Sequence, residues 1–173
     1  MKRIYFLALL FSFSIIAFWQ TTEVKWYTIQ EAEQLIKENP RPIFVDTYTD
    51  WCGWCKKMDK DTFTDKVITD LLNNKFYAVK FDAESSEKVT FQGREFINDG
   101  KAGKAHQLAV ALLQGQLSYP TVVFLNEKAQ LISPVPGYRE PKEMEVIMSF
   151  FANKAYETTK FEDYQKTFLS KIQ

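Results

Sequence analysis

The only two cysteines of the chain lie in one four-residue stretch, Cys52-Gly53-Trp54-Cys55, shortly after an apolar run that Asp46 interrupts. The apolar run, 42–49, predicts a buried strand, and the residues from Gly53 onward predict a helix, so Cys52 lies where that helix begins. The unpaired N–H groups and the macrodipole of a helix start stabilise a thiolate. A disulfide that closes so small a loop removes little entropy from the unfolded chain, so redox chemistry explains the pair better than stability does.

The first twenty residues predict a separate segment. Lys2 and Arg3 form a positively charged start, and residues 4–19 follow without a charge. This run is shorter than the roughly 20 residues that a membrane span needs, and it is typical of a secretory signal. We therefore expect residues 1–20 to be a signal peptide, with an uncleaved membrane anchor as the alternative, and residues 24–173 to form one domain.

The balance of charge argues against nucleic acid as a partner. Lysine and arginine together number 22, and so do aspartate and glutamate, which leaves no basic excess to attract phosphates. At 46% hydrophobic residues, the chain has ample material for a buried core.

Hydrophobic periodicity divides the remaining chain into alternating helices and strands. A capping-box pattern from Thr28 to Glu31 begins the first helix, and Pro40 closes it. The order of elements favours an α/β architecture with parallel crossovers first and an antiparallel pair at the end. Beyond the first helix, the predicted elements are a strand at 42–49, a helix from 53 with a continuation that Thr64 caps, a strand at 76–82, a small hairpin at 89–96, a helix at 105–112, strands at 120–126 and 129–133, a helix from Pro141 and an amphipathic segment from Phe161 to Ile172.

Four separate segments of the chain resemble the thioredoxin superfamily. Residues 45–56 resemble its active-site segment, and 78–82 resemble its third strand with a buried lysine. Tyr119-Pro120-Thr121 resembles its cis-proline signature, and Gly137 lies where the family has a glycine after the last hairpin. The order and spacing of these segments are far more specific than the Cys-x-x-Cys pair alone.

The resemblance covers about residues 24–152 and implies a thioredoxin fold, in which helices flank a central mixed sheet. The block 84–117 is longer than in a minimal thioredoxin, so we expect an insertion before the cis-proline strand. The residues after 153 are additional, and we expect them to form an extra C-terminal helix.

The resemblance also implies catalytic roles. Cys52 would be the exposed nucleophile, and Cys55 would be the resolving thiol that breaks the mixed disulfide. Asp46 would be a buried carboxylate that handles the Cys55 proton, with Lys80 as its charge partner. Burial raises the pKa of a carboxyl, which suits a proton acceptor near neutral pH. The alternative for Asp46 is a strand-end carboxylate that water satisfies.

Four further residues are predicted to bind substrate. Trp51 and Trp54 would form an apolar rim that contacts partners. Pro120, in the cis form, would present the backbone of Tyr119 to a client strand for main-chain pairing.

Metal binding remains as an alternative interpretation of the cysteine pair. Zinc prefers four ligands, and the only other soft ligand is His106, which lies off the apolar helix stripe and is expected to be solvated. A copper-carrying Cys-x-x-Cys is conceivable, but the flanking strand and proline favour redox chemistry. We expect no metal and no organic cofactor.

The sequence therefore predicts an exported thiol–disulfide oxidoreductase, periplasmic or secreted, that reduces or exchanges disulfides in proteins. We expect a monomer supplied with electrons by a membrane or exported thiol partner. An oxidase or isomerase is the alternative within the class, because Trp54 replaces the proline or histidine common at that position and the intervening residues tune the redox potential. A metal carrier or a client-binding module is the alternative without enzymatic activity.

Overall fold

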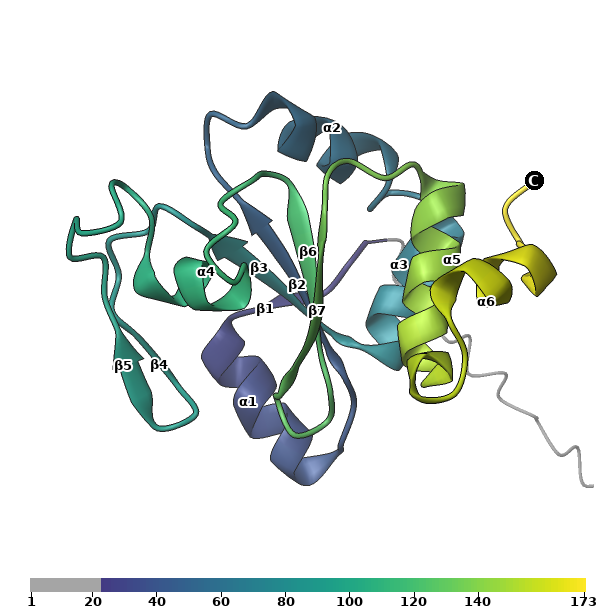
Figure 1. Ribbon diagram of the computed structural model, residues 1–173, viewed down its shortest axis with the longest axis horizontal. Helices are drawn as coiled ribbons and strands as arrows, with labels where there is room; N and C mark the ends of the chain where they lie inside the picture. The colour runs from purple at the N-terminus through teal and green to yellow at the C-terminus, as the bar shows by residue number, and fades with distance from the viewer. Residues whose placement is uncertain (1–22) are drawn as a thin grey trace, which may run out of the picture.

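The computed structural model describes residues 23–173, so the predicted signal peptide at 1–20 lies outside the described residues. The centre of the fold is a five-stranded mixed sheet in the order β1-β3-β2-β6-β7 (Figure 1). The three strands β1, β3 and β2 pair in parallel, β6 runs antiparallel to β2, and β7 runs antiparallel to β6. The strands span Trp26–Tyr27 (β1), Ile43–Tyr48 (β2), Tyr77–Asp82 (β3), Thr121–Leu125 (β6) and Leu131–Pro136 (β7).

Helices cover both faces of this sheet. They are α1 (Ile29–Glu38), α2 (Gly53–Asp61), α3 (Lys66–Lys75), α4 (Gln107–Leu112) and α5 (Pro141–Ala152). Alternate residues of a strand point to opposite faces, so Val45 packs in the core with α1 and α4, whereas Phe44 packs with α3 and α5. Asp46 lies two residues after Phe44 on the same strand, so the two side chains point to the same face of the sheet. The strand pattern therefore directs its side chain to the face that Met58 of α2 also covers.

The capping box predicted at the first helix is confirmed. The Thr28 hydroxyl accepts the Glu31 N–H at 3.2 Å, and the Glu31 carboxylate accepts the Thr28 N–H at 2.7 Å. These two bonds satisfy donors that a helix start would otherwise leave unpaired. The helix ends at Glu38, with Asn39 as its C-cap, just before Pro40.

The segment between β3 and α4 contains the predicted hairpin. Its strands are β4 (Val89–Phe91) and β5 (Arg94–Phe96), and the two residues of the turn, Gln92 and Gly93, both have positive φ angles. Such a turn matches the twist of an antiparallel pair. The Gln92 N–H donates to the Glu33 carboxylate at 3.0 Å, which fixes the hairpin against α1.

Two of the predicted boundaries are wrong. Asp65, rather than Thr64, caps α3, because its carboxylate accepts the N–H groups of Val67 and Ile68. The last strand is displaced from 129–133 to Leu131–Pro136, because Ala129 lies in the turn with a φ of 57°. Proline is tolerated in β7 because that strand lies at the edge of the sheet.

The residues after α5 continue into a 3₁₀ turn (Ala155–Glu157) and α6 (Phe161–Thr167). The ring of Phe150 on α5 lies 5.3 Å from those of both Phe161 and Tyr164, so the predicted aromatic stripe packs against α5. Within residues 23–173, no helix is both long and apolar enough to cross a membrane.

Candidate redox-active site

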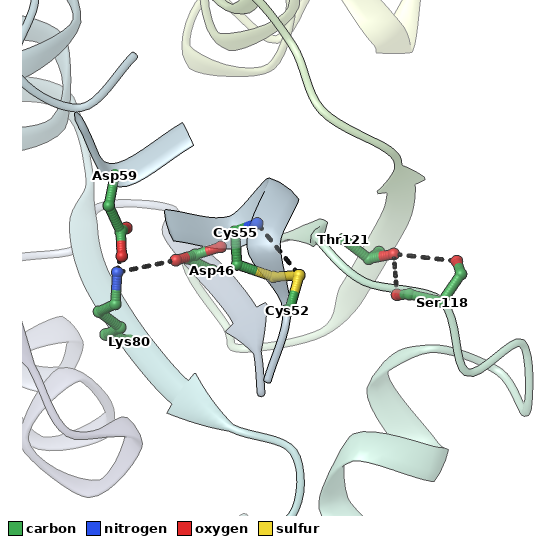
Figure 2. The surroundings of a disulfide bond; sticks show 7 residues. All are labelled: Asp46, Cys52, Cys55, Asp59, Lys80, Ser118 and Thr121. Atoms are coloured by element: carbon green, nitrogen blue, oxygen red, sulfur yellow. Dashed lines mark hydrogen bonds and ion pairs between the residues drawn. A yellow bond between two sulfur atoms is a disulfide. The ribbon is translucent and has the colours of Figure 1, made fainter. Parts of the chain in front are cut away.

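The two cysteines lie at the junction of β2 and α2 and form a disulfide, with 5.3 Å between their Cα atoms (Figure 2). Cys52 is the N-cap of α2. Its sulfur accepts the N–H of Cys55 at 3.0 Å, and its own N–H donates to the Thr49 carbonyl at 3.1 Å. The backbone therefore places the first sulfur at the positive end of the helix, where it would stabilise a thiolate after reduction.

Cys52 is less accessible than its predicted role implies. It is 4% exposed, so the expectation of an exposed nucleophile is wrong for the disulfide form. The S–S bond ties its sulfur to Cys55 in the first turn of α2, and Cys55 is itself buried. Trp51 and Trp54, which adjoin the two cysteines in the sequence, are by contrast exposed.

Asp46 is a buried carboxylate with few partners. It is 1% exposed, and neither of its oxygens accepts a hydrogen bond from any residue in the described part of the chain. Lys80 Nζ lies 3.2 Å from Asp46 Oδ2, an ion pair without hydrogen-bond geometry. Burial raises the pKa of Asp46 from 3.8 to about 6; the positive charge of Lys80 opposes this rise, and the negative charge of Asp59 adds to it. The carboxyl is therefore not a solvated strand end.

Lys80 lies directly across from Asp46 in the register of β2 and β3. Its ammonium also pairs with Asp59 of α2, and it lies 5.1 Å and 5.2 Å from the ring centroids of Trp26 and Tyr48. The Lys80 side chain is 24% exposed. It is therefore only partly buried, whereas the resemblance implied a buried lysine. Sequence reasoning missed Asp59. Its position four residues after Cys55, on the same helix face, was the available signal.

Two aromatic pairs flank the disulfide. Trp51 is 64% exposed and meets Tyr119 edge-on at 6.0 Å, and Trp54 is 58% exposed and lies 5.4 Å from Tyr138. The prediction from sequence did not include Tyr138. It lies right after Gly137, in the loop between β7 and α5, and the preceding β7 was itself misplaced.

The peptide bond between Tyr119 and Pro120 is cis. The Pro120 carbonyl accepts the Gly137 N–H at 2.8 Å, which joins the loops before β6 and after β7. Figure 2 draws Ser118 and Thr121, on either side of this bond, among the surroundings of the disulfide, and the Thr121 hydroxyl donates to the Ser118 carbonyl at 2.7 Å. The structure thus places Cys52, Trp51, Trp54 and Tyr119 around the start of α2, whereas Lys80, the partner of Asp46, meets Asp59 near the end of that helix.

His106 is not the solvated helix residue that the sequence predicted. It is fully buried, its Nδ1 accepts the Leu108 N–H at 3.1 Å, and its Nε2 lies 3.0 Å from the Glu87 carbonyl. Because Nδ1 accepts, Nε2 carries the ring proton and donates. His106 caps α4. Across residues 23–173, no three His, Cys, Asp or Glu side chains are grouped so as to hold a metal ion.

Residues 29–152 match the model of one protein family, which is described as a thioredoxin-like domain. The chain belongs to the thioredoxin-like family. The predicted resemblance to the thioredoxin superfamily and the thioredoxin fold are thereby confirmed, and Cys52 and Cys55 form the disulfide of the Cys-x-x-Cys pair.

Two curated relatives and one solved structure illustrate the relationship. A protein of Caenorhabditis elegans is 28% identical over 130 residues, which are 73% of this chain and 16% of that protein. The thiol:disulfide interchange protein DsbD of Escherichia coli K12 is 27% identical over 110 residues, which are 63% of this chain and 16% of DsbD. A thioredoxin from Thermus thermophilus superposes with a TM-score of 0.57 at 21% identity, over 76% of this chain and 89% of that one. The thioredoxin-like protein thus spans only a small part of either curated relative.

Proposed function

We propose that this thioredoxin-like protein is an exported oxidoreductase that reduces or exchanges disulfides in client proteins. The observation that carries the proposal is the Cys52–Cys55 disulfide at the start of α2, with the buried carboxyl of Asp46 among its surroundings in Figure 2. A pair that exchanges thiols needs a stabilised thiolate and a nearby proton acceptor, and this arrangement offers both.

The reaction begins from the reduced pair. The Cys52 thiolate attacks one sulfur of a client disulfide, a mixed disulfide forms, and the other client sulfur leaves as a thiolate that takes a proton from water. Cys55 then gives its proton to Asp46, and the resulting thiolate attacks the Cys52 sulfur. The Cys52–Cys55 disulfide forms, and the second client sulfur leaves. Two electrons have passed from the protein to the client, and a dithiol donor restores the reduced pair.

Client recognition would use the aromatic surface around the sulfurs. Trp51 and Trp54 are half or more exposed and offer apolar contact area, and Tyr119 adjoins Trp51 at the start of β6. A client strand that lies along Tyr119 and Pro120 would form main-chain hydrogen bonds beside the disulfide.

Export and the electron donor are part of the same proposal. The charged start and apolar run of residues 1–20 favour a cleaved signal, which would leave residues 24–173 as a monomeric periplasmic or secreted enzyme. The similarity to the thiol:disulfide interchange protein DsbD supports exchange with a partner thiol, and the proposed donor is a membrane or exported thiol protein. N-terminal sequencing of the exported protein would test cleavage, and a mature chain that still begins at Met1 would contradict it.

The decisive experiment combines insulin reduction with trapping of clients. We expect catalytic turnover with a dithiol donor, abundant mixed disulfides in the Cys55→Ser variant, and almost none in Cys52→Ser. Equal trapping by the two variants would contradict the assigned roles. Stoichiometric metal binding without turnover would instead favour a carrier, and client binding without turnover a holding module.

A further inference from the structure

One ammonium group serves two carboxylates at the redox site. Lys80 Nζ contacts Asp46 Oδ2 at 3.2 Å and also donates a hydrogen bond to Asp59 Oδ1 (Figure 2). The two acids differ in environment, because Asp46 is 1% exposed whereas the Asp59 side chain is 39% exposed. Asp59 therefore connects the buried carboxyl, through Lys80, to the surface of the molecule.

The division of Lys80 between the two acids is unequal. Asp59 receives a hydrogen bond from the ammonium, whereas Asp46 has only the ion pair. Asp59 thereby limits how strongly Lys80 can stabilise the charged form of Asp46. Its own negative charge also raises the pKa of Asp46, after the larger effect of burial and against the charge of Lys80.

The other charged groups near Lys80 do not change how its ammonium pairs with Asp46 and Asp59. Glu23 lines the same opening as Lys80 and Asp59, and Tyr48 of β2 places its ring over the ammonium. Lys56 and Lys60 flank Asp59 on α2, yet neither is within ion-pairing distance of either acid. Among residues 23–173, Lys80 is the one cation paired with Asp46 and with Asp59.

We propose that Asp59 is a positioning residue of the redox site, which holds Lys80 and adds negative charge so that Asp46 can accept the Cys55 proton near neutral pH. The proposal rests on the proposed function, because the step concerned is the resolution of the mixed disulfide. In that step the Cys55 S–H proton passes to Asp46, the Cys55–Cys52 bond forms, and the bond from Cys52 to the client breaks with the electron pair on the client sulfur.

The same arrangement places Lys80, the ion-pair partner of Asp46, at an opening of the protein surface. This opening of about 430 Å³ is lined by residues that include Asp59, Lys80 and Trp26. In Figure 2, Asp59 and Lys80 lie on one side of the disulfide, and Ser118 and Thr121 lie on the other. A client strand along Pro120 therefore covers the sulfurs and leaves the Lys80 side open to water.

The test is a titration of Asp46 that requires no activity. Carbon-13 NMR of the side-chain carboxyl in the oxidised full chain should give a midpoint near pH 6 for the wild type. In Asp59→Asn, we expect the midpoint to fall by about one pH unit, because a like charge is lost and Lys80 is released to Asp46. Asp59→Glu should restore the wild-type midpoint, since it keeps the charge.

The matched control is Asp61→Asn. Asp61 lies on the same helix, pairs with Lys57 and not with Lys80, and its replacement removes the same charge from α2. We expect this variant to leave the Asp46 midpoint within a few tenths of a pH unit of the wild type. Equal shifts in the Asp59 and Asp61 variants, or no shift in either, would overturn the proposal.

A kinetic measurement links the titration to the reaction. The rate of release of a client thiol from the Cys52 mixed disulfide should rise with pH, and in Asp59→Asn the midpoint of that rise should move to lower pH, with a lower plateau because Asp46 is then a weaker base. A uniform loss of rate at every pH would mark Asp59 as merely structural and overturn the proposal. Failure of the wild type to release client would contradict the proposed function, whereas the carboxyl titration would still test the role of Asp59 independently.

Discussion

Asp46 and Glu145 are both 1% exposed, yet their surroundings are opposite. Glu145 on α5 accepts hydrogen bonds from the Ser170 hydroxyl at 2.5 Å and from the Lys171 N–H at 2.9 Å. Within residues 23–173, Asp46 accepts no hydrogen bond and has only its ion pair with Lys80. Both carboxylates are removed from water, and only one is compensated for it by hydrogen bonds.

The difference separates two uses of a buried acid. Donors converge on Glu145 from the C-terminal tail, residues 168–173, so its carboxylate fixes that tail against α5, and Ile172 packs on the core beside it. Asp46 is left short of donors, which favours its neutral form and leaves it able to exchange a proton. Burial alone therefore does not assign a role, and the number of donors that reach the carboxylate does.

The largest expected effect is on turnover. Asp46→Asn should slow insulin reduction near neutral pH by about ten- to a thousand-fold, because the variant cannot accept the Cys55 proton. Alkylation of Cys52 should change much less. Glu145→Gln should leave turnover near the wild-type value, since that carboxylate only holds the tail. An unchanged pH profile in Asp46→Asn would remove the distinction between the two acids.

The next effect is on stability, and its sign depends on pH. The pKa of Asp46 is about 6 in the folded protein and 3.8 ordinarily, so folding favours the protonated form. Its contribution to stability is complete below pH 3.8 and is lost as the pH rises through 6. The change that Asp46→Asn makes in the free energy of unfolding of the oxidised protein should therefore be more stabilising at pH 7 than at pH ~3.5, by about 3 kcal/mol. Urea unfolding at the two pH values measures this, and a gain independent of pH would contradict it.

Glu145→Gln should act in the opposite direction. A carboxamide offers one acceptor oxygen, and its NH₂ group would face the N–H groups of Lys171 and Ile172. Leaving these donors unsatisfied should destabilise the protein by about 1–3 kcal/mol at pH 7 in the same urea experiment. A Glu145→Gln variant as stable as the wild type would mean that the tail bonds contribute little.

The smallest effect is the coupling between Glu145 and the tail. Deletion of residues 169–173 should lower the free energy of unfolding more in the wild type than in Glu145→Gln, because the variant has already lost part of the interaction. The difference should be about 1 kcal/mol in a double-mutant cycle. Strictly additive effects would show that the tail is held by Ile172 and other packing contacts alone.

The sequence by itself determined the features that depend on neighbours in the chain. The capping box at Thr28, the turn at Gln92-Gly93 and the start of α2 at the cysteine pair follow from local hydrogen bonding and backbone preference. The two-residue period of a strand likewise sets which face of the sheet each side chain of β2 and β3 occupies. The resemblance of residues 45–56 to the thioredoxin active-site segment, rather than this strand pattern, was what assigned Asp46 to the predicted redox site.

Only the tertiary structure decided which groups, distant in the sequence, contact each buried polar side chain. Asp59 meets Asp46 through a lysine from a third element, Glu145 is satisfied by a tail 25 residues away, and His106 is enclosed by contacts from Glu87 and Phe81. The short strand β1 exists because β3 offers it an edge for pairing. Local sequence specifies backbone conformation within a few residues, whereas the donors and charges that reach a buried group come from packing between elements.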